Sequence, residues 1–120
     1  MRPISLFVSA ALVFGPAPVA QAHAFLDHAE PKVGTEIAKA PSQVRLSFSE
    51  SLVLRFCHVT VTGPAGFGGA GPVRQAPGDT KSLVVDLRPP IPPGAYVVRW
   101  RVVSADTHAT EGDFAFKVKP

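Results

Sequence analysis

The sequence is poor in cysteine, methionine, tyrosine and tryptophan, with one residue of each among 120. Because Cys57 is the only cysteine, the chain cannot form an internal disulfide, and a structural zinc site built from several thiolates is excluded. Charge is also scarce, since 18% of the residues are charged and the net charge of +3 includes no basic run. This pattern excludes the usual surface of a nucleic-acid-binding protein, and we expect no nucleic-acid partner.

No hydrophobic run is long enough to span a membrane, and the most pronounced one covers residues 6–13. It follows a basic start and precedes the small residues Ala20 and Ala22, as in a secretory signal peptide. The alternative is a membrane anchor, but a bilayer needs about 20 apolar residues. We therefore expect residues 1–22 to be a cleaved signal peptide, and residues 23–120 to be exported as a mature chain that does not insert into the membrane.

Long helices are excluded by 13 prolines and 10 glycines. Alternation of apolar and polar residues predicts β-strands instead, separated by turns rich in Gly and Pro, at residues 43–49, 57–62, 82–87, 95–103 and 112–119. About 100 mature residues suit one domain, and we predict an all-β fold with two packed antiparallel sheets of about seven short strands. We interpret the glycine-rich residues 63–71 as a mobile hairpin loop, because the lysine and helix of a phosphate-binding loop are missing.

Two groups of residues could bind a metal ion. Cleavage after Ala22 would make His23 the first residue, and its free α-amine and imidazole can chelate one ion, although it could simply be the residue after the cut. Asp106 and His108 are two residues apart where a strand enters a turn, so both side chains can point to the same side. Asp106 could alternatively serve only to stabilise the turn.

Together these residues offer two imidazoles, one amine and one carboxylate. That set suits Cu(II), with a distorted zinc site as the alternative. Cu(I) prefers thioether or thiolate sulfur, and the expected mature chain lacks methionine because the only one is Met1.

The other candidate side chains have simpler interpretations. His28 could approach the metal, but we interpret it as an exposed histidine at a strand end. Cys57 and His58 are adjacent in a strand and should point to opposite faces. We interpret Cys57 as a small buried residue, with a reactive or metal-bound thiol as the alternative. Tyr96 and Trp100 alternate with valines and are interpreted as core residues or walls of the site.

Three segments resemble the CopC family of periplasmic copper-resistance proteins, most of all its short, methionine-poor YobA-type members. They are the start His23-Ala24-x-Leu26, the segment Leu46-Ser-Phe-Ser-Glu50, and the closing run Trp100-Arg-Val-Val-Ser-Ala-Asp106-Thr-His108-x-x-x-Gly112-x-Phe114-x-Phe116. The resemblance covers essentially the whole expected mature chain. It implies a Greek-key β-sandwich or barrel, described as cupredoxin-like or immunoglobulin-like.

The resemblance also implies a function. It implies a non-catalytic protein of copper homeostasis and resistance that binds copper in the periplasm, with a CopD-like inner-membrane protein as partner, and we expect a monomer. It places the Cu(II) ligands on His23, Asp106 and His108, and a carboxylate near the site, without ligating, on Glu50. The family's Cu(I) site relies on a methionine-rich loop that is missing here. Thr107 departs from the pattern, which usually has Gly there, and a different turn geometry would shift His108.

Two other functions remain open at this stage. The first is a small copper oxidase of the histidine-brace type, which also chelates copper through an N-terminal histidine. Such enzymes use a second His rather than Asp-x-His, keep coordination positions open for oxygen, and need a broader substrate face. The second is a metal-free β-sandwich interaction domain, which would leave the two candidate groups far apart.

Overall fold

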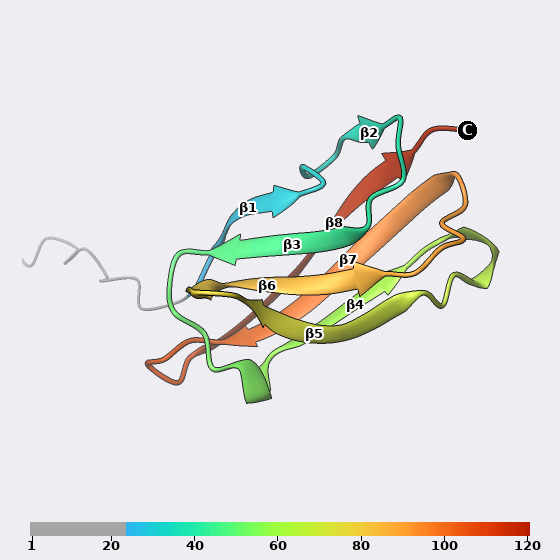
Figure 1. The fold of residues 1–120 in the computed structure, drawn as a ribbon. Coiled ribbons are helices and arrows are strands. Elements are labelled where there is room, and N and C mark those ends of the chain that lie inside the picture. Colours follow the sequence, from blue (N-terminus) through green and yellow to red (C-terminus); the bar gives the residue numbers. More distant parts are fainter. Residues whose placement is uncertain (1–23) are drawn as a thin grey trace, which may run out of the picture.

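The computed structural model describes residues 24–120, which form two four-stranded β-sheets packed face to face (Figure 1). The strands in chain order are β1 (Leu26–Glu30), β2 (Glu36–Ile37), β3 (Gln43–Phe48), β4 (His58–Thr62), β5 (Ala70–Ala76), β6 (Asp79–Leu87), β7 (Gly94–Val103) and β8 (Ala109–Val118). Two three-residue 3-10 helices, η1 (Leu54–Phe56) and η2 (Pro64–Gly66), are the only helical segments of this part of the chain. The predicted all-β sandwich is therefore confirmed. The expected signal peptide and His23 lie outside the described residues.

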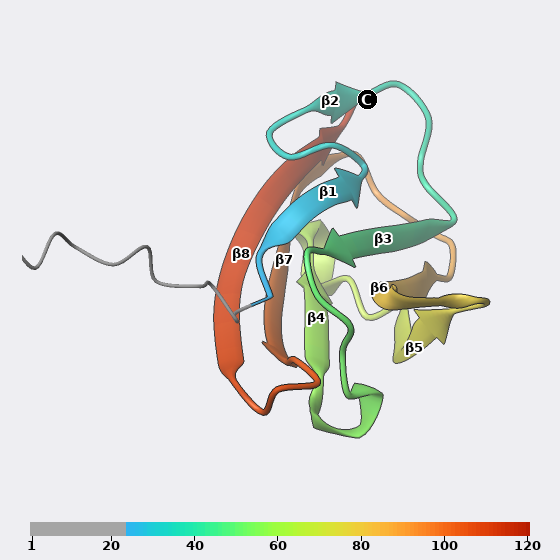
Figure 2. The ribbon, with the colours of Figure 1, turned by 90° about the vertical axis from the view of Figure 1, so that its left-hand side faces the viewer.

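One sheet has the strand order β1-β3-β6-β5 and the other has the order β2-β8-β7-β4, and Figure 2 shows them as two separate layers. All neighbouring strands are antiparallel except β2, which pairs over two residues in parallel with β8. The prediction of purely antiparallel sheets is wrong at this edge. A strand of two residues has too little alternation to be recognised in a sequence.

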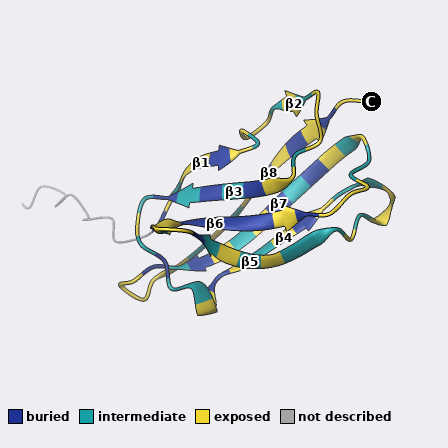
Figure 3. Ribbon diagram, viewed as in Figure 1, coloured by how far each residue is buried: buried dark blue, intermediate teal, exposed yellow. Residues whose placement is uncertain are grey.

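The core lies between the sheets, and alternation along the strands builds it (Figure 3). In β7, for example, Tyr96, Val98 and Val102 are buried while Arg99 and Arg101 between them are exposed. Full burial of one large apolar side chain contributes about 1.5–3 kcal/mol, so the inward-facing residues supply the main stabilising free energy. They include Val44, Leu46, Phe48, Leu83, Val85, Leu87, Tyr96, Val98, Val102, Phe114, Phe116 and Val118.

The glycine-rich segment 63–71 is not a hairpin loop, contrary to the sequence-based interpretation. It follows β4 of one sheet and leads into β5 of the other, so it crosses between the sheets. Its last residues, Ala70 and Gly71, already belong to β5. Sequence alternation could not reveal this, because β5 combines glycine and proline with small residues and has no clear period of two.

Three segments that are distant in sequence meet at one end of the sandwich. The hairpin between β7 and β8, the end of β3 and the start of β1 all lie at this end in Figure 1, and Figure 2 views the same end from the front. Loops of a β-sandwich gather at its two ends, which gives such folds their usual place for a binding site. The candidate residues Asp106 and His108 belong to the hairpin here.

Candidate metal site

The turn from Ser104 to His108 closes the β7–β8 hairpin. The backbone N–H of Ser104 donates to the His108 carbonyl over 3.0 Å, and that of Thr107 donates to the Ser104 carbonyl over 2.8 Å. Thr107 has a φ of 74°, in the left-handed region that favours glycine and that a β-branched residue rarely adopts. The threonine thus takes a backbone conformation that a glycine would adopt readily. The expected effect of Thr107 on the position of His108 stays a prediction.

Asp106 and His108 are brought together by this turn, as the spacing predicts. Oδ2 of Asp106 lies 3.3 Å from Nδ1 of His108, and Oδ1 accepts a hydrogen bond of 3.3 Å from the His108 backbone N–H. The hydroxyl of Ser104, a residue only 1% exposed, also donates to Oδ1 of Asp106. The carboxylate is therefore oriented by three contacts before any ion binds.

The electrostatics of the turn favour an ionised carboxylate. The hydrogen bond from the Ser104 hydroxyl lowers the pKa of Asp106 most, and the backbone and side chain of His108 lower it further. The side chains of Asp106 and His108 remain 37% and 54% exposed, so an ion or a partner protein can reach them from solvent. Chemically, this pair offers one carboxylate and one imidazole on an open surface.

The described chain begins beside this hairpin. The hydroxyl of Thr110 donates to the carbonyl of Ala24 over 2.7 Å. The backbone N–H of Phe25 donates to the Ser49 hydroxyl over 2.9 Å, and the Phe25 carbonyl accepts from the Ser49 N–H over 2.9 Å. These contacts bring Ala24, the first described residue, close to the β7–β8 hairpin. His23 itself lies outside the described residues.

Glu50, the carboxylate expected near the site, is exposed and lies in the segment between β3 and η1. This segment contacts both the opening residues and the β7–β8 hairpin. Of the two neighbours of Glu50, Ser49 holds Phe25, and the carbonyl of Ser51 accepts a hydrogen bond of 2.9 Å from the Ala105 backbone N–H. The position of Glu50 between these two attachments is compatible with the expected role. The expected role of Glu50, near the metal but not bound to it, stays a prediction.

Trp100 forms part of the wall between the sheets at this end. Its ring meets Phe48 edge to face, with ring centroids 5.1 Å apart and an angle of 78° between the planes. On the adjacent strand it lies against Gly112, where a Cβ atom would come within 2.6 Å of the indole. The indole Nε1 is buried, and no residue from 24 to 120 accepts its hydrogen. Tyr96, fully buried, belongs to the core.

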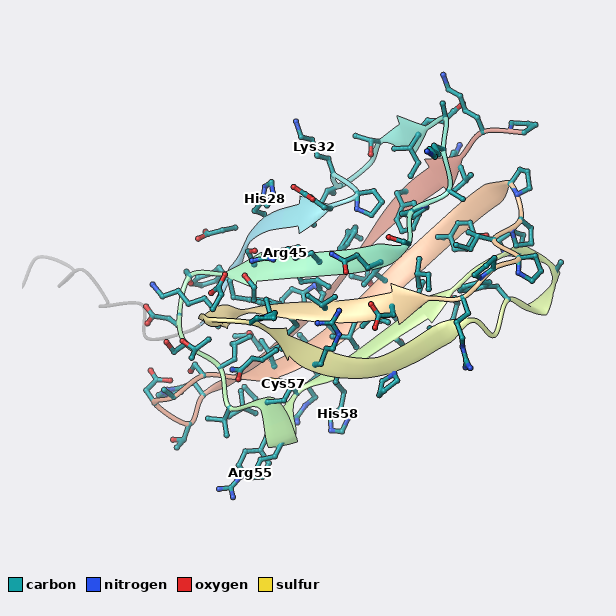
Figure 4. The ribbon with its side chains drawn as sticks, viewed as in Figure 1. His28, Lys32, Arg45, Arg55, Cys57 and His58 are labelled. Carbon is teal, nitrogen blue, oxygen red and sulfur yellow. The ribbon has the colours of Figure 1, made fainter. Side chains whose placement is uncertain are left out.

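His28, His58 and Cys57, all labelled in Figure 4, lie on other segments than the β7–β8 hairpin. His28 is exposed on β1, with Nε2 3.3 Å from Oε1 of Glu30, and His58 is exposed on β4 in the other sheet. Cys57 is buried, its thiol donates to the Val53 carbonyl over 3.3 Å, and burial raises its pKa. The interpretations of His28 as exposed and of Cys57 as a buried small residue are confirmed.

Within residues 24–120, no group of three or more His, Cys, Asp or Glu side chains converges on one point. Among the described residues, Asp106 and His108 remain a pair, and the third residue expected from the sequence, His23, lies outside them. Sequence reasoning did not single out Ser49 or Thr110 as contacts of the entering chain. Nothing in a linear pattern signals such contacts, because Thr110 and its partner Ala24 are 86 residues apart. In the same part of the chain, no helix is long and apolar enough to cross a membrane.

Comparison with known proteins gives consistent matches. Residues 26–119 match the CopC domain family. Copper resistance protein C of Escherichia coli is 41% identical over 115 residues, which cover 90% of each chain, and protein YobA of Escherichia coli strain K12 is 37% identical over 103 residues, which cover 85% of this chain and 83% of YobA. The crystal structure of PcoC, a methionine-rich copper resistance protein from Escherichia coli, superimposes with a TM-score of 0.72 at 36% identity and covers 82% of this chain and all of PcoC. The chain belongs to the CopC family.

Proposed function

We propose that this chain is an exported Cu(II)-binding protein of copper homeostasis and resistance, which holds copper in the periplasm and passes it to a CopD-like inner-membrane protein. Membership of the CopC family gives the chain a copper-related role. The Cu(II) ligands in this proposal are the α-amine and imidazole of His23, the carboxylate of Asp106 and the imidazole of His108. The mature chain starts at His23 after removal of residues 1–22.

One observation carries the proposal: the described chain begins beside the hairpin that pairs Asp106 with His108. The hydrogen bond from Thr110 to the Ala24 carbonyl connects the two regions. A metal-free interaction domain has no need for these regions to meet, so their contact favours a shared ion. Three nitrogen donors and one oxygen donor in a roughly planar set are the preference of Cu(II), which also binds most tightly among the divalent first-row metals.

The preference for Cu(II) over Cu(I) rests on the lack of soft ligands. PcoC is described as methionine-rich, whereas the only methionine of this chain is Met1, in the expected signal peptide. The one thiol, Cys57, is buried against Val53, and burial raises its pKa, so it is a poor source of thiolate. Weak Cu(I) binding that is unchanged in Cys57→Ser is expected in a competition assay. Tight Cu(I) binding that disappears in this variant would contradict the assignment of valence.

A binding role, and not an oxidase role, follows from the same ligand set. A fourth donor from Asp106 fills a position that a copper oxidase keeps open for oxygen. The exposed edge of the site suits transfer to a partner, because the side chain of His108 is 54% exposed. Reduction of the copper-loaded protein in air should therefore give little sustained peroxide production.

The decisive experiment is a Cu(II) titration of two purified forms of the mature protein, with a chelator as competitor. The first form has a free α-amine at His23, and the second carries an acetyl group on that amine. Acetylation converts the amine of His23 into an amide without adding a new terminal amine, and it removes one of four donors, so the Kd should rise by roughly 100-fold or more. Equal affinities would exclude His23 chelation and with it the proposed site. Mass spectrometry of the exported protein should find His23 as the first residue.

A further inference from the structure

Thr110 connects the two parts of the candidate site. It is the second residue of β8 and lies two positions after His108, and its side chain shares the inward face of that strand with Phe114 and Phe116. From there its hydroxyl reaches the carbonyl of Ala24 over 2.7 Å and 86 positions in sequence. This hydrogen bond joins the opening segment of the described chain to the strand that His108 precedes.

The other contacts of the opening segment serve a different purpose. Both hydrogen bonds between Phe25 and Ser49 tie the segment to the end of β3, which lies in the same sheet as β1. The methyl group of Ala24 is fully buried and packs in the core. Thr110 instead belongs to β8 of the opposite sheet, which carries the Asp106–His108 hairpin, and its hydroxyl donates to Ala24 of the opening segment. It therefore restricts movement of the opening segment relative to that hairpin.

This restriction matters for an ion that is bound from both sides. If the opening segment is free to move relative to the hairpin, metal binding has to order the two parts, and the entropic cost of that ordering reduces the binding free energy. A segment that is already held in place keeps more of that free energy for metal affinity. Residues that orient the ligands of a metal site typically change its affinity by 10–100-fold when they are mutated.

We propose that Thr110 is a positioning residue of the copper site, and that its hydroxyl holds the opening segment against the closing hairpin so that His23 meets Asp106 and His108. This inference rests on the proposed function, since it assumes that His23 is a ligand. Thr110 does not touch the ion. It acts through the carbonyl of Ala24, the residue that follows His23.

The test compares Thr110→Val with Thr110→Ser in the mature protein. Valine keeps the size and branching of threonine but removes the hydroxyl, whereas serine keeps the hydroxyl. Thr110→Val should raise the Kd for Cu(II) about 10-fold, and Thr110→Ser should stay within about twofold of the wild type. Thr62→Val is the matched control. The hydroxyl of Thr62, at the end of β4, also donates to a backbone carbonyl, that of Val97 in β7, over 3.5 Å. The affinity of this variant for Cu(II) should be unchanged.

A second readout separates positioning from general stability. In the metal-free protein, hydrogen exchange of the Phe25 amide should become faster in Thr110→Val and remain as in the wild type in Thr62→Val. The affinity measurement is then repeated with the α-amine of His23 acetylated. If Thr110 acts through His23, Thr110→Val should have little further effect in this background.

The outcomes distinguish the two hypotheses. If acetylation of His23 weakens binding but Thr110→Val binds Cu(II) like the wild type, the positioning role is wrong and the proposed function stands. Equal losses in Thr110→Val and Thr110→Ser would assign the effect to packing and would also overturn the positioning role. If acetylation leaves the affinity unchanged, the proposed function itself fails.

Discussion

Oδ2 of Asp106 lies 3.3 Å from Nδ1 of His108, and the same spacing and separation recur in the pair formed by Glu30 and His28. In each pair the two residues are two positions apart in the sequence. The side chain of His108 is 54% exposed and that of His28 is 52% exposed. The local chemistry of the two pairs is therefore nearly the same. The two pairs differ in location. Only the Asp106–His108 hairpin leads into β8, the strand whose Thr110 donates a hydrogen bond to Ala24.

This similarity provides a matched comparison for copper binding. His108→Ala should raise the Kd for Cu(II) by roughly 100-fold or more, since it removes a primary donor. His28→Ala removes an equivalent imidazole from β1 and should change the Kd less than twofold. Isothermal titration with a competing chelator measures both values. A larger loss in His28→Ala than in His108→Ala would move the site to the edge of the first sheet.

Thr107→Gly should stabilise the metal-free protein by about 1 kcal/mol, because glycine adopts a positive φ without the steric cost that threonine incurs. The φ of Thr107 is 74°. The reverse change, Gly78→Ala, is the control: Gly78 has a φ of 69° with no atom near its missing Cβ, so only backbone strain is added. It should destabilise the protein by about 1 kcal/mol. Urea unfolding measures both. A loss of stability in Thr107→Gly would mean that the threonine side chain has a stabilising contact.

Gly112→Ala should destabilise the fold by about 1–3 kcal/mol, as overpacking does in cores. A Cβ atom at this position would lie 2.6 Å from the Trp100 ring, too close for the ring to remain in place. Gly71→Ala in β5 is the control, since its nearest atom is a carbonyl oxygen at 3.4 Å. Because Trp100 is the only tryptophan, its fluorescence reports on the change directly. The emission spectrum should shift in Gly112→Ala and not in Gly71→Ala.

The sequence predicted the regular strands well and the sheet edges poorly. Residues 43–49 alternate strictly, and residues 95–103 are rich in valine with a polar residue at positions 99 and 101. Both segments coincide with β3 and β7 to within one residue. β5 was missed because it contains Gly71 and Pro72, which are typical of loops, and it is held by its pairing with β6. Pairing between strands is a tertiary property, and local alternation carries no information about it.

The candidate site divides in the same way. The spacing of Asp106 and His108 within one turn is local, and the sequence alone was sufficient to predict that their side chains meet. The Ser104 hydroxyl bond to Asp106 is also local, and a serine two residues before an aspartate could have suggested it. The contact of Thr110 with Ala24 depends on how the two sheets pack, so only the structure reveals it.

The stability of the metal-free protein should depend on Asp79 in acid. The hydrogen bond from the Ser82 hydroxyl, 2.7 Å long, lowers the pKa of Asp79 most, followed by the Lys81 backbone N–H, and Arg45 also contributes. The pKa in the folded state therefore lies below its ordinary value of 3.8. A lowered folded pKa means that the carboxylate stabilises the fold at pH values above 3.8, and that this contribution is lost as the pH falls through the folded pKa.

Asp79→Asn should consequently be less stable than the wild type between about pH 5 and about pH 8, and the difference should shrink as the pH falls below the ordinary carboxyl pKa of 3.8. Ser82→Ala, which removes the largest cause of the shift, should lose part of the same pH-dependent difference. Urea unfolding at a series of pH values measures it, and subtraction of the variant from the wild type cancels the contribution of Asp106, whose pKa is also lowered. A difference that stays constant down to pH 2.5 would show that Asp79 acts through its shape and hydrogen bonds and not through its charge.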